Sequence, residues 1–474
     1  MESKKSLSVH TAWYTVGNFL IRSISFSLLP LYSNLLTTSE FGDYALLVSM
    51  YTIASVVYQS GMQNALSKFY LESKSSEQSG RIFSSIYNSI VIFGLLLTFL
   101  SIIFSKNISW LILGTPQHSK LISLVFIALL VETLSFFPLH LLKTKEKSSK
   151  VVLCSSASAA INLPLNFLLV YKYRMGIEGI FLAQIISSLA LMLTILPSIL
   201  NEIKMQIDKN LLTKMFLFSL PFMIAVIFSS AVDVSDRFFL NIFTSKNEVG
   251  IYSLSYRIAM TMNLFVISFR TAWVPRSLNI YKSQNYSIEF GNIFKKLISV
   301  SFIIVLLITL FAPYLFQVKL FGINILNKSY EPGLIILPYV LLGYFFSGLG
   351  VFYSLFPFVS SKSHYFLYSD LIALLVNIIL NFTLIPLTGM IGAAAATTLA
   401  YFSSAFFLFV VSRNKIIIDY PIREIIIIVF SATIFLFVGM IIKDLILDIA
   451  LIISYLLISI KLSDIRFGSL FKLG

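Results

Sequence analysis

Long apolar segments separated by short polar loops follow one another along almost the whole chain. A helix needs roughly 20 predominantly apolar residues to cross a bilayer, and about 14 segments have that length. Unbroken runs of this kind do not fit the alternating pattern of membrane barrels, so each is predicted to be a helix. The expected helices cover approximately residues 11–34, 42–63, 82–104, 121–142, 150–170, 178–199, 215–236, 250–271, 296–316, 333–357, 365–386, 390–411, 422–441 and 444–460.

The composition supports an all-α membrane protein and excludes other classes. Of 474 residues, 57% are hydrophobic and 12% charged, with a mean hydropathy of +0.89, whereas soluble domains carry about a quarter charged residues. The net charge of +14 is scattered in short clusters, without the basic stripe of a nucleic-acid-binding protein. One cysteine, Cys154, and four scattered histidines give no metal-ligand pattern. We therefore expect no cofactor, no metal and no nucleic-acid partner.

The basic residues also predict an orientation. With the N-terminus inside, 23 of the 35 Lys and Arg residues fall in cytoplasmic segments, nine on the opposite side and three within helices. Positively charged loops stay in the cytoplasm. A multi-pass protein with both termini cytoplasmic is expected.

Two short motifs each occur twice in the same order. The segment EFGDYAL at 40–46 recurs as EVGIYSL at 248–254, and NLPLNF at 162–167 recurs as NIILNF at 377–382, at offsets of 208 and 215 residues. These offsets span six helices, an even number, so the two copies have the same orientation in the membrane.

This repeat predicts two parallel six-helix lobes around a central cavity, followed by two C-terminal helices. The N-lobe, helices 1 to 6, is expected at 1–204 and the C-lobe, helices 7 to 12, at 205–412. Helices 13 and 14, with a short cytoplasmic tail, occupy 413–474.

Five charged residues interrupt the expected spans: Arg22, Glu132, Asp233, Arg257 and Asp370. A charge at the centre of a membrane helix costs about 3 kcal/mol even on the most forgiving insertion scales, and such residues usually line a polar path. These residues indicate a polytopic transporter.

Three stretches carry a resemblance to a known family: residues 39–72, which begin SEFGDYALL; residues 220–259, which contain DRFFL and EVGIYS; and residues 271–278, TAWVPRSL. They are similar to the polysaccharide flippases, the Wzx-like branch of the multidrug/oligosaccharidyl-lipid/polysaccharide exporter superfamily. The resemblance implies alternating access in the bacterial cytoplasmic (inner) membrane. The implied cargo is an undecaprenyl-pyrophosphate-linked oligosaccharide repeat unit of O-antigen, lipopolysaccharide or capsule, moved to the outer leaflet. Implied partners are the lipid bilayer, a polysaccharide polymerase and a chain-length regulator.

Such a cargo suggests roles for the charged residues. A pyrophosphate is bound by fixed cations, for which the arginine fork is well suited, so we expect substrate-binding roles for Asn18, Arg22, Asp233, Arg257 and Arg270. Static pairing within a lobe, of Arg22 with Glu132 and of Arg257 with Asp233, is the alternative.

Two carboxylates are candidates for ion coupling, as in an antiporter driven by an ion gradient. Glu132 lies near the centre of its expected helix and Asp370 near the inner end of its own. Asp236 and Arg237 are expected at the outer mouth of the cavity. There they would cap a helix end or form an ion pair at the rim of the cavity.

Other functions remain open at this point. A lipid II flippase or a cation-coupled drug or metabolite exporter would share the fold, and a membrane glycan polymerase or acyltransferase represents a different class. No interhelical loop exceeds about 25 residues, and no His, Asp or Glu cluster accompanies a candidate nucleophile. We therefore expect a non-enzyme.

Overall fold

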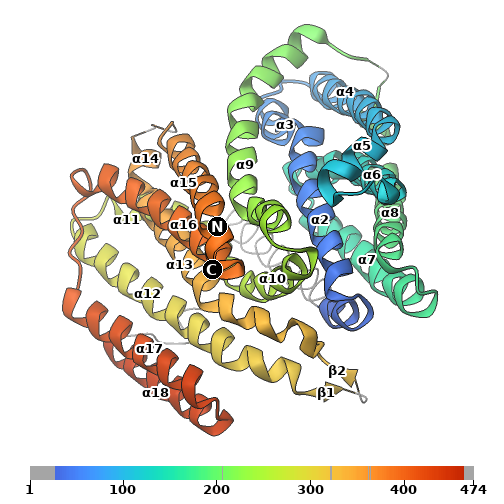
Figure 1. The fold of residues 1–474 in the computed structure, drawn as a ribbon. Helices are drawn as coiled ribbons and strands as arrows, with labels where there is room; N and C mark the ends of the chain where they lie inside the picture. The colour runs from blue at the N-terminus through green and yellow to red at the C-terminus, as the bar shows by residue number, and fades with distance from the viewer. Residues whose placement is uncertain (1–26, 205, 321–322, 361, 363, 464–474) are drawn as a thin grey trace. The chain divides into compact units, whose positions relative to one another are not determined.

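The computed structural model describes residues 27–204, 206–320, 323–360, 362 and 364–463 (Figure 1). Most of these residues are helical, and 12 helices in this part of the chain are long and apolar enough to cross a membrane. The expected all-α membrane architecture is confirmed. One small addition is an antiparallel pair of two-residue strands, β1 (Lys319–Leu320) and β2 (Ile323–Asn324).

Two of the approximately 14 expected spans are not among the 12. The first, 11–34, falls mostly in residues 1–26, outside the described part. The eighth, 250–271, is divided between α10 (Lys246–Ala259) and α11 (Thr261–Ile280), which are separated at Met260.

The chain divides into two compact units, Met1–Val234 and Ser235–Gly474, called unit 1 and unit 2 below. In unit 1, α6 packs against α2, α4 and α8, and α7 pairs with α8 (Figure 1). Residues 27–35 are helical, and the named helices are α2 (Thr38–Gln59), α3 (Met62–Leu71), α4 (Ser76–Ile103), α5 (Ser105–Leu113), η1 (Pro116–His118), α6 (Ser119–Thr144), α7 (Ser148–Asn166), η2 (Phe167–Lys172), α8 (Gly176–Ile195), η3 (Leu196–Ser198) and η4 (Leu200–Glu202). Helix α9 (Lys209–Phe243) continues from unit 1 into unit 2.

In unit 2, α13 packs against α11, α12 and α16, and α15 pairs with α16. The last two helices, α17 and α18, pack on each other and on α12 (Figure 1). After α10 and α11, the helices are α12 (Tyr286–Phe311), η5 (Ala312–Phe316), η6 (Lys328–Ile336), α13 (Leu337–Tyr353), α14 (Leu355–Val359), α15 (His364–Thr388), α16 (Met390–Arg413), α17 (Ile422–Ile442) and α18 (Leu445–Ser463).

The repeated sequence motifs have repeated structural roles. Glu40 closes a capping box with Thr37 at the start of α2, and Glu248 donates its backbone N–H to the Ser245 hydroxyl at the start of α10. These bonds satisfy N–H groups that a helix start leaves without partners. The helix pairs also correspond, since α6–α8 and α7–α8 in unit 1 match α13–α16 and α15–α16 in unit 2.

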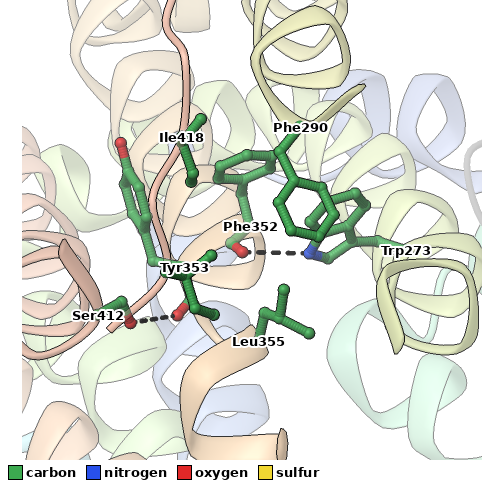
Figure 2. Close-up of a pocket in the computed structure, with 8 residues that line it drawn as sticks. Trp273, Phe290, Phe352, Tyr353, Leu355, Ser412 and Ile418 are labelled. Atoms are coloured by element: carbon green, nitrogen blue, oxygen red, sulfur yellow. Dashed lines mark hydrogen bonds between the residues drawn. The ribbon is translucent and has the colours of Figure 1, made fainter. Parts of the chain in front are cut away.

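Pro357 leaves a carbonyl group without its helical partner, and a side chain from another helix bonds to it. Pro357 has no N–H for the carbonyl of Tyr353, four residues earlier, and the Ser412 hydroxyl donates to that carbonyl at 3.0 Å. Trp273 Nε1 donates to the adjacent carbonyl of Phe352 at 3.2 Å, beside a small apolar cavity (Figure 2). Both bonds give partners to backbone carbonyls at the end of α13, because a carbonyl without a hydrogen-bond partner is costly inside a membrane protein.

Hydrogen bonds hold the segment between α8 and α9, residues 196–208, against α4. Ser84 donates to the Glu202 carbonyl at 2.7 Å, and Asn88 Nδ2 donates to the Lys204 carbonyl at 2.8 Å. The Ser85 hydroxyl accepts the N–H of Asp208 at 3.0 Å. This connection therefore belongs structurally to unit 1.

Lys145, at the end of α6, adds an ion pair with Glu202 in the same connection. Burial opposes the charge on Lys145, but bonds to Glu202 and Tyr70 outweigh it and raise the pKa of Lys145 above its ordinary value. The pair is only one-fifth exposed on each side.

Candidate functional site

Glu132 is the centre of a polar cluster inside unit 1. The Tyr51 hydroxyl from α2 donates to Glu132 Oε2, and Gln184 Nε2 from α8 donates to the same oxygen at 3.0 Å. All three side chains are half-buried. Among the described residues, no hydrogen-bond donor reaches the second oxygen, Oε1. Tyr51 and Gln184 thus hold the carboxylate by Oε2.

A line of side-chain hydrogen bonds leads toward this cluster from α7. Every donor points along the same direction, so the bonds can polarise one another. The steps are Tyr32 OH to Asn166 Oδ1 at 2.6 Å, Asn166 Nδ2 to Asn162 Oδ1 at 2.9 Å, Asn162 Nδ2 to Ser187 Oγ at 3.0 Å, and Ser187 Oγ to the Gln184 carbonyl at 3.0 Å.

The corresponding asparagines of unit 2 form a similar line. Asn381 Nδ2 donates to Asn377 Oδ1 at 2.8 Å, and Asn377 Nδ2 donates to Thr397 Oγ1 at 3.4 Å. Close by, the Tyr252 hydroxyl donates to Asp236 Oδ2. The paired asparagines therefore bond to each other in both units.

Asp236 and Arg237 are buried in unit 2, with exposures of 0% and 7%. Arg237 Nη1 lies 3.1 Å from Asp236 Oδ1, and the guanidinium carbon lies 4.6 Å from the centre of the Tyr256 ring. The two charges pair as expected, but the pair is buried and not exposed as at a rim, because Tyr252 and Tyr256 of α10 lie against Asp236 and Arg237. Their depth in a membrane stays a prediction.

The other expected site residues lie in several places. Arg257, on α10, is half-buried, as is Asp233 on α9. Arg270, on α11, is exposed, and its charge interacts with that of half-buried Asp370 on α15. The sequence assigned these two residues separate roles, in substrate binding and in ion coupling. Asn18 and Arg22 lie outside the described residues.

Sequence reasoning missed Tyr51, Gln184 and Tyr252. Gln184 could have been noticed as an uncharged polar residue in the apolar run of 178–199. The tyrosines could not, because the chain has 23 of them and no sequence pattern marks Tyr51 and Tyr252 as the ones that bond to Glu132 and Asp236.

The family model for polysaccharide biosynthesis proteins matches residues 9–281, more than half of the chain. The chain belongs to this family. A search of curated proteins gives no match. The expected relationship to polysaccharide biosynthesis proteins is confirmed, and the protein is a multi-pass membrane protein; its place in the Wzx-like branch stays a prediction.

Several solved structures of membrane transport proteins have a fold similar to that of this chain. The lipid II flippase MurJ, in an inward closed conformation, is 19% identical; the match covers 98% of this chain and 99% of that one, with a TM-score of 0.76. An inward-facing MATE family multidrug transporter of the MOP superfamily is 15% identical, with 83% and 93% coverage and a TM-score of 0.62. A MOP superfamily transporter from Pyrococcus furiosus is 14% identical, with 86% and 93% coverage and a TM-score of 0.60.

Proposed function

We propose that this protein is a flippase that moves undecaprenyl-pyrophosphate-linked oligosaccharide repeat units from the cytoplasmic to the outer leaflet. It works by alternating access of its two lobes, is driven by an ion gradient and catalyses no chemical reaction. The observation that carries the proposal is the match of a flippase fold to 98% of this chain, against 83% for the MATE transporter. Membership of the polysaccharide biosynthesis family supports a glycan as the cargo.

The charged residues have distinct roles in this proposal. Arg22 and Arg257 bind the pyrophosphate, with Asn18, Asp233 and Arg270 beside them, because arginine forms paired, charge-assisted bonds to phosphate oxygens. Glu132 and Asp370 couple transport to the ion gradient. Asp236 and Arg237 support unit 2 near the outer mouth.

The cellular setting follows from the same proposal. The protein lies in the bacterial inner membrane with both termini in the cytoplasm, as the 23 to nine distribution of basic residues favours. A polysaccharide polymerase and a chain-length regulator receive its product for O-antigen, lipopolysaccharide or capsule.

Deletion of the gene tests the proposal. We expect loss of surface polysaccharide and accumulation of the lipid-linked oligosaccharide in the inner leaflet, both reversed by the wild-type gene. Normal surface polysaccharide in the deletion strain would refute this function.

A lipid II flippase is the second candidate, because that protein gives the 0.76 TM-score. It predicts that expression of this chain restores growth to cells depleted of their own lipid II flippase. Restored growth, with no effect of the deletion on surface polysaccharide, would favour this candidate.

A further inference from the structure

Helix α5 separates its residues into a packed face and an exposed face. At 3.6 residues per turn, its exposed side chains lie together on one side of the helix: Lys106, Asn107, Trp110 and Leu111. The opposite side, on which Ser109 and Leu113 are buried, packs on α2, α4 and α6 (Figure 1). The exposed face thus combines a positive charge and an amide with two large apolar side chains.

This face lies at the membrane surface. Helix α5 begins directly after α4, which is long and apolar enough to span the bilayer, and the expected orientation places this end of α4 on the outer side. Trp110 is 65% exposed and Leu111 72%. A helix with such a face lies in the plane of the interface, with its apolar side chains at the boundary of the acyl chains and the indole at the level of the headgroups.

A cleft on the same face is lined by Lys106, Asn107, Trp110 and Pro116 and has a volume of about 210 Å³. One water occupies roughly 30 Å³ of the liquid, so the cleft has room for a larger polar group. Lys106 is the charged residue of this lining, and its ammonium group has three hydrogen-bond donors. The side-chain amide of Asn107 adds two donors and one acceptor. These groups are suited to a phosphate that carries a hydroxylated substituent.

The polar cleft and the apolar side chains together match an anionic phospholipid. Its phosphate lies at the level of the headgroups, and its acyl chains begin directly below, where Trp110 and Leu111 are exposed. A zwitterionic headgroup brings an ammonium group that Lys106 repels. Phosphatidylglycerol instead has a net negative charge, which attracts lysine, and hydroxyls that can donate to Asn107 Oδ1.

We infer that α5 holds a binding site for an anionic phospholipid of the phosphatidylglycerol type. The phosphate lies against Lys106 and Asn107 in the cleft, and the upper part of an acyl chain contacts Trp110. The bound lipid fixes the depth of this end of unit 1 in the bilayer. This site goes beyond the proposed function and does not depend on the cargo.

Quenching of Trp110 fluorescence tests the site in the full chain. The protein is reconstituted in vesicles of phosphatidylcholine with a minor fraction of phosphatidylglycerol, and an equal amount of one lipid or of the other carries bromine on its acyl chains. The chain has three tryptophans, so each protein is compared with its Trp110→Phe form to isolate the signal of Trp110. Brominated phosphatidylglycerol should quench wild type several-fold more than brominated phosphatidylcholine does.

Substitutions in the cleft should change this preference in a defined order. Lys106→Gln should abolish the preference, and Asn107→Leu should weaken it. Lys106→Arg should keep it, because arginine retains the charge and binds phosphate. The matched control is Lys120→Gln, which removes the same charge at the start of α6, where Lys120 is exposed and pairs with Glu178 outside the cleft. This control should keep the preference of wild type.

Three results would overturn the inference. Equal quenching of wild type by the two brominated lipids would show that no anionic lipid is selected. A preference that survives in Lys106→Gln would place the lipid elsewhere. Loss of the preference in Lys120→Gln to the same extent as in Lys106→Gln would show general attraction of anionic lipid to a basic protein, without a site on α5. None of these measurements uses the transported lipid, so failure of the proposed function would leave them unchanged.

Discussion

Replacement of Arg237 by methionine would leave the Asp236 carboxylate buried without its cation. Removal of one member of a buried ion pair typically costs about 3–5 kcal/mol. Tyr252 would still donate to Asp236, so we expect about 3 kcal/mol, the lower end of that range. A unit the size of Ser235–Gly474 loses about 2–4 °C of melting temperature per kcal/mol, which gives a decrease of roughly 6–12 °C.

Size-exclusion chromatography of a fluorescent fusion after heating in detergent measures this decrease. The double variant Asp236→Asn with Arg237→Met should recover most of it, because asparagine keeps an acceptor for Tyr252 and leaves no charge. Lys120→Met is the control: its pair with Glu178 has a lysine side chain that is 71% exposed, and such pairs contribute less than about 1 kcal/mol. If Arg237→Met melts within about 2 °C of wild type, or if the double variant is no better than the single one, the buried pair is not what stabilises unit 2.

Three further predictions concern topology, the substrate site and packing. Reporter fusions at Lys147 and Lys209 should be cytoplasmic and those at Ser119 and Lys328 external, and any two on the wrong side would contradict the expected orientation. At matched protein levels, Arg257→Lys should export more glycan than Arg257→Ala, and Arg257→Glu should export none. Lysine keeps the positive charge but lacks the two parallel N–H donors of the guanidinium group. Export by the alanine variant at the wild-type level would exclude the residue from the substrate site. Gly333→Ala should lower the free energy of unfolding by about 1–3 kcal/mol, since its Cβ would lie 2.7 Å from the Ile251 carbonyl oxygen. Gly348→Ala should be tolerated, because its Cβ would lie 3.7 Å from the nearest atom. Equal melting temperatures of the two variants would contradict this packing.

The helices were predictable because apolar length is nearly sufficient to define a membrane span. The repeat was predictable for a local reason, since Glu40 and Glu248 both lie at the start of a helix where capping favours such residues. The break at Met260 was not, because no proline or glycine lies beside Met260 to mark the interruption.

The candidate site was only partly predictable. A charge in an apolar run identified Glu132, since a charge there is costly whatever surrounds it, whereas Asp236 was expected only at the outer mouth. Their environments depend on residues more distant in sequence, such as Tyr51 for Glu132. Burial of Arg237 likewise depends on the tyrosines of α10, which sequence spacing alone could not place over its guanidinium.

Helix α9 extends across the boundary between unit 1 and unit 2, which lies at Val234 and Ser235. The sequence repeat predicts a boundary between the lobes at residues 204 and 205. The second sequence copy was expected to begin at residue 205, yet unit 1 extends to Val234. Met215 of α9 is fully buried in the same apolar core as Phe83 and Phe137. If the halves were expressed as separate polypeptides, a cut at residue 204 would open that core, whereas a cut after Phe243 would keep it closed. If a single six-helix lobe once folded alone, another helix must have occupied the position that Met215 of α9 now fills in the core of unit 1. That helix would have come from the same lobe or from a second copy of it.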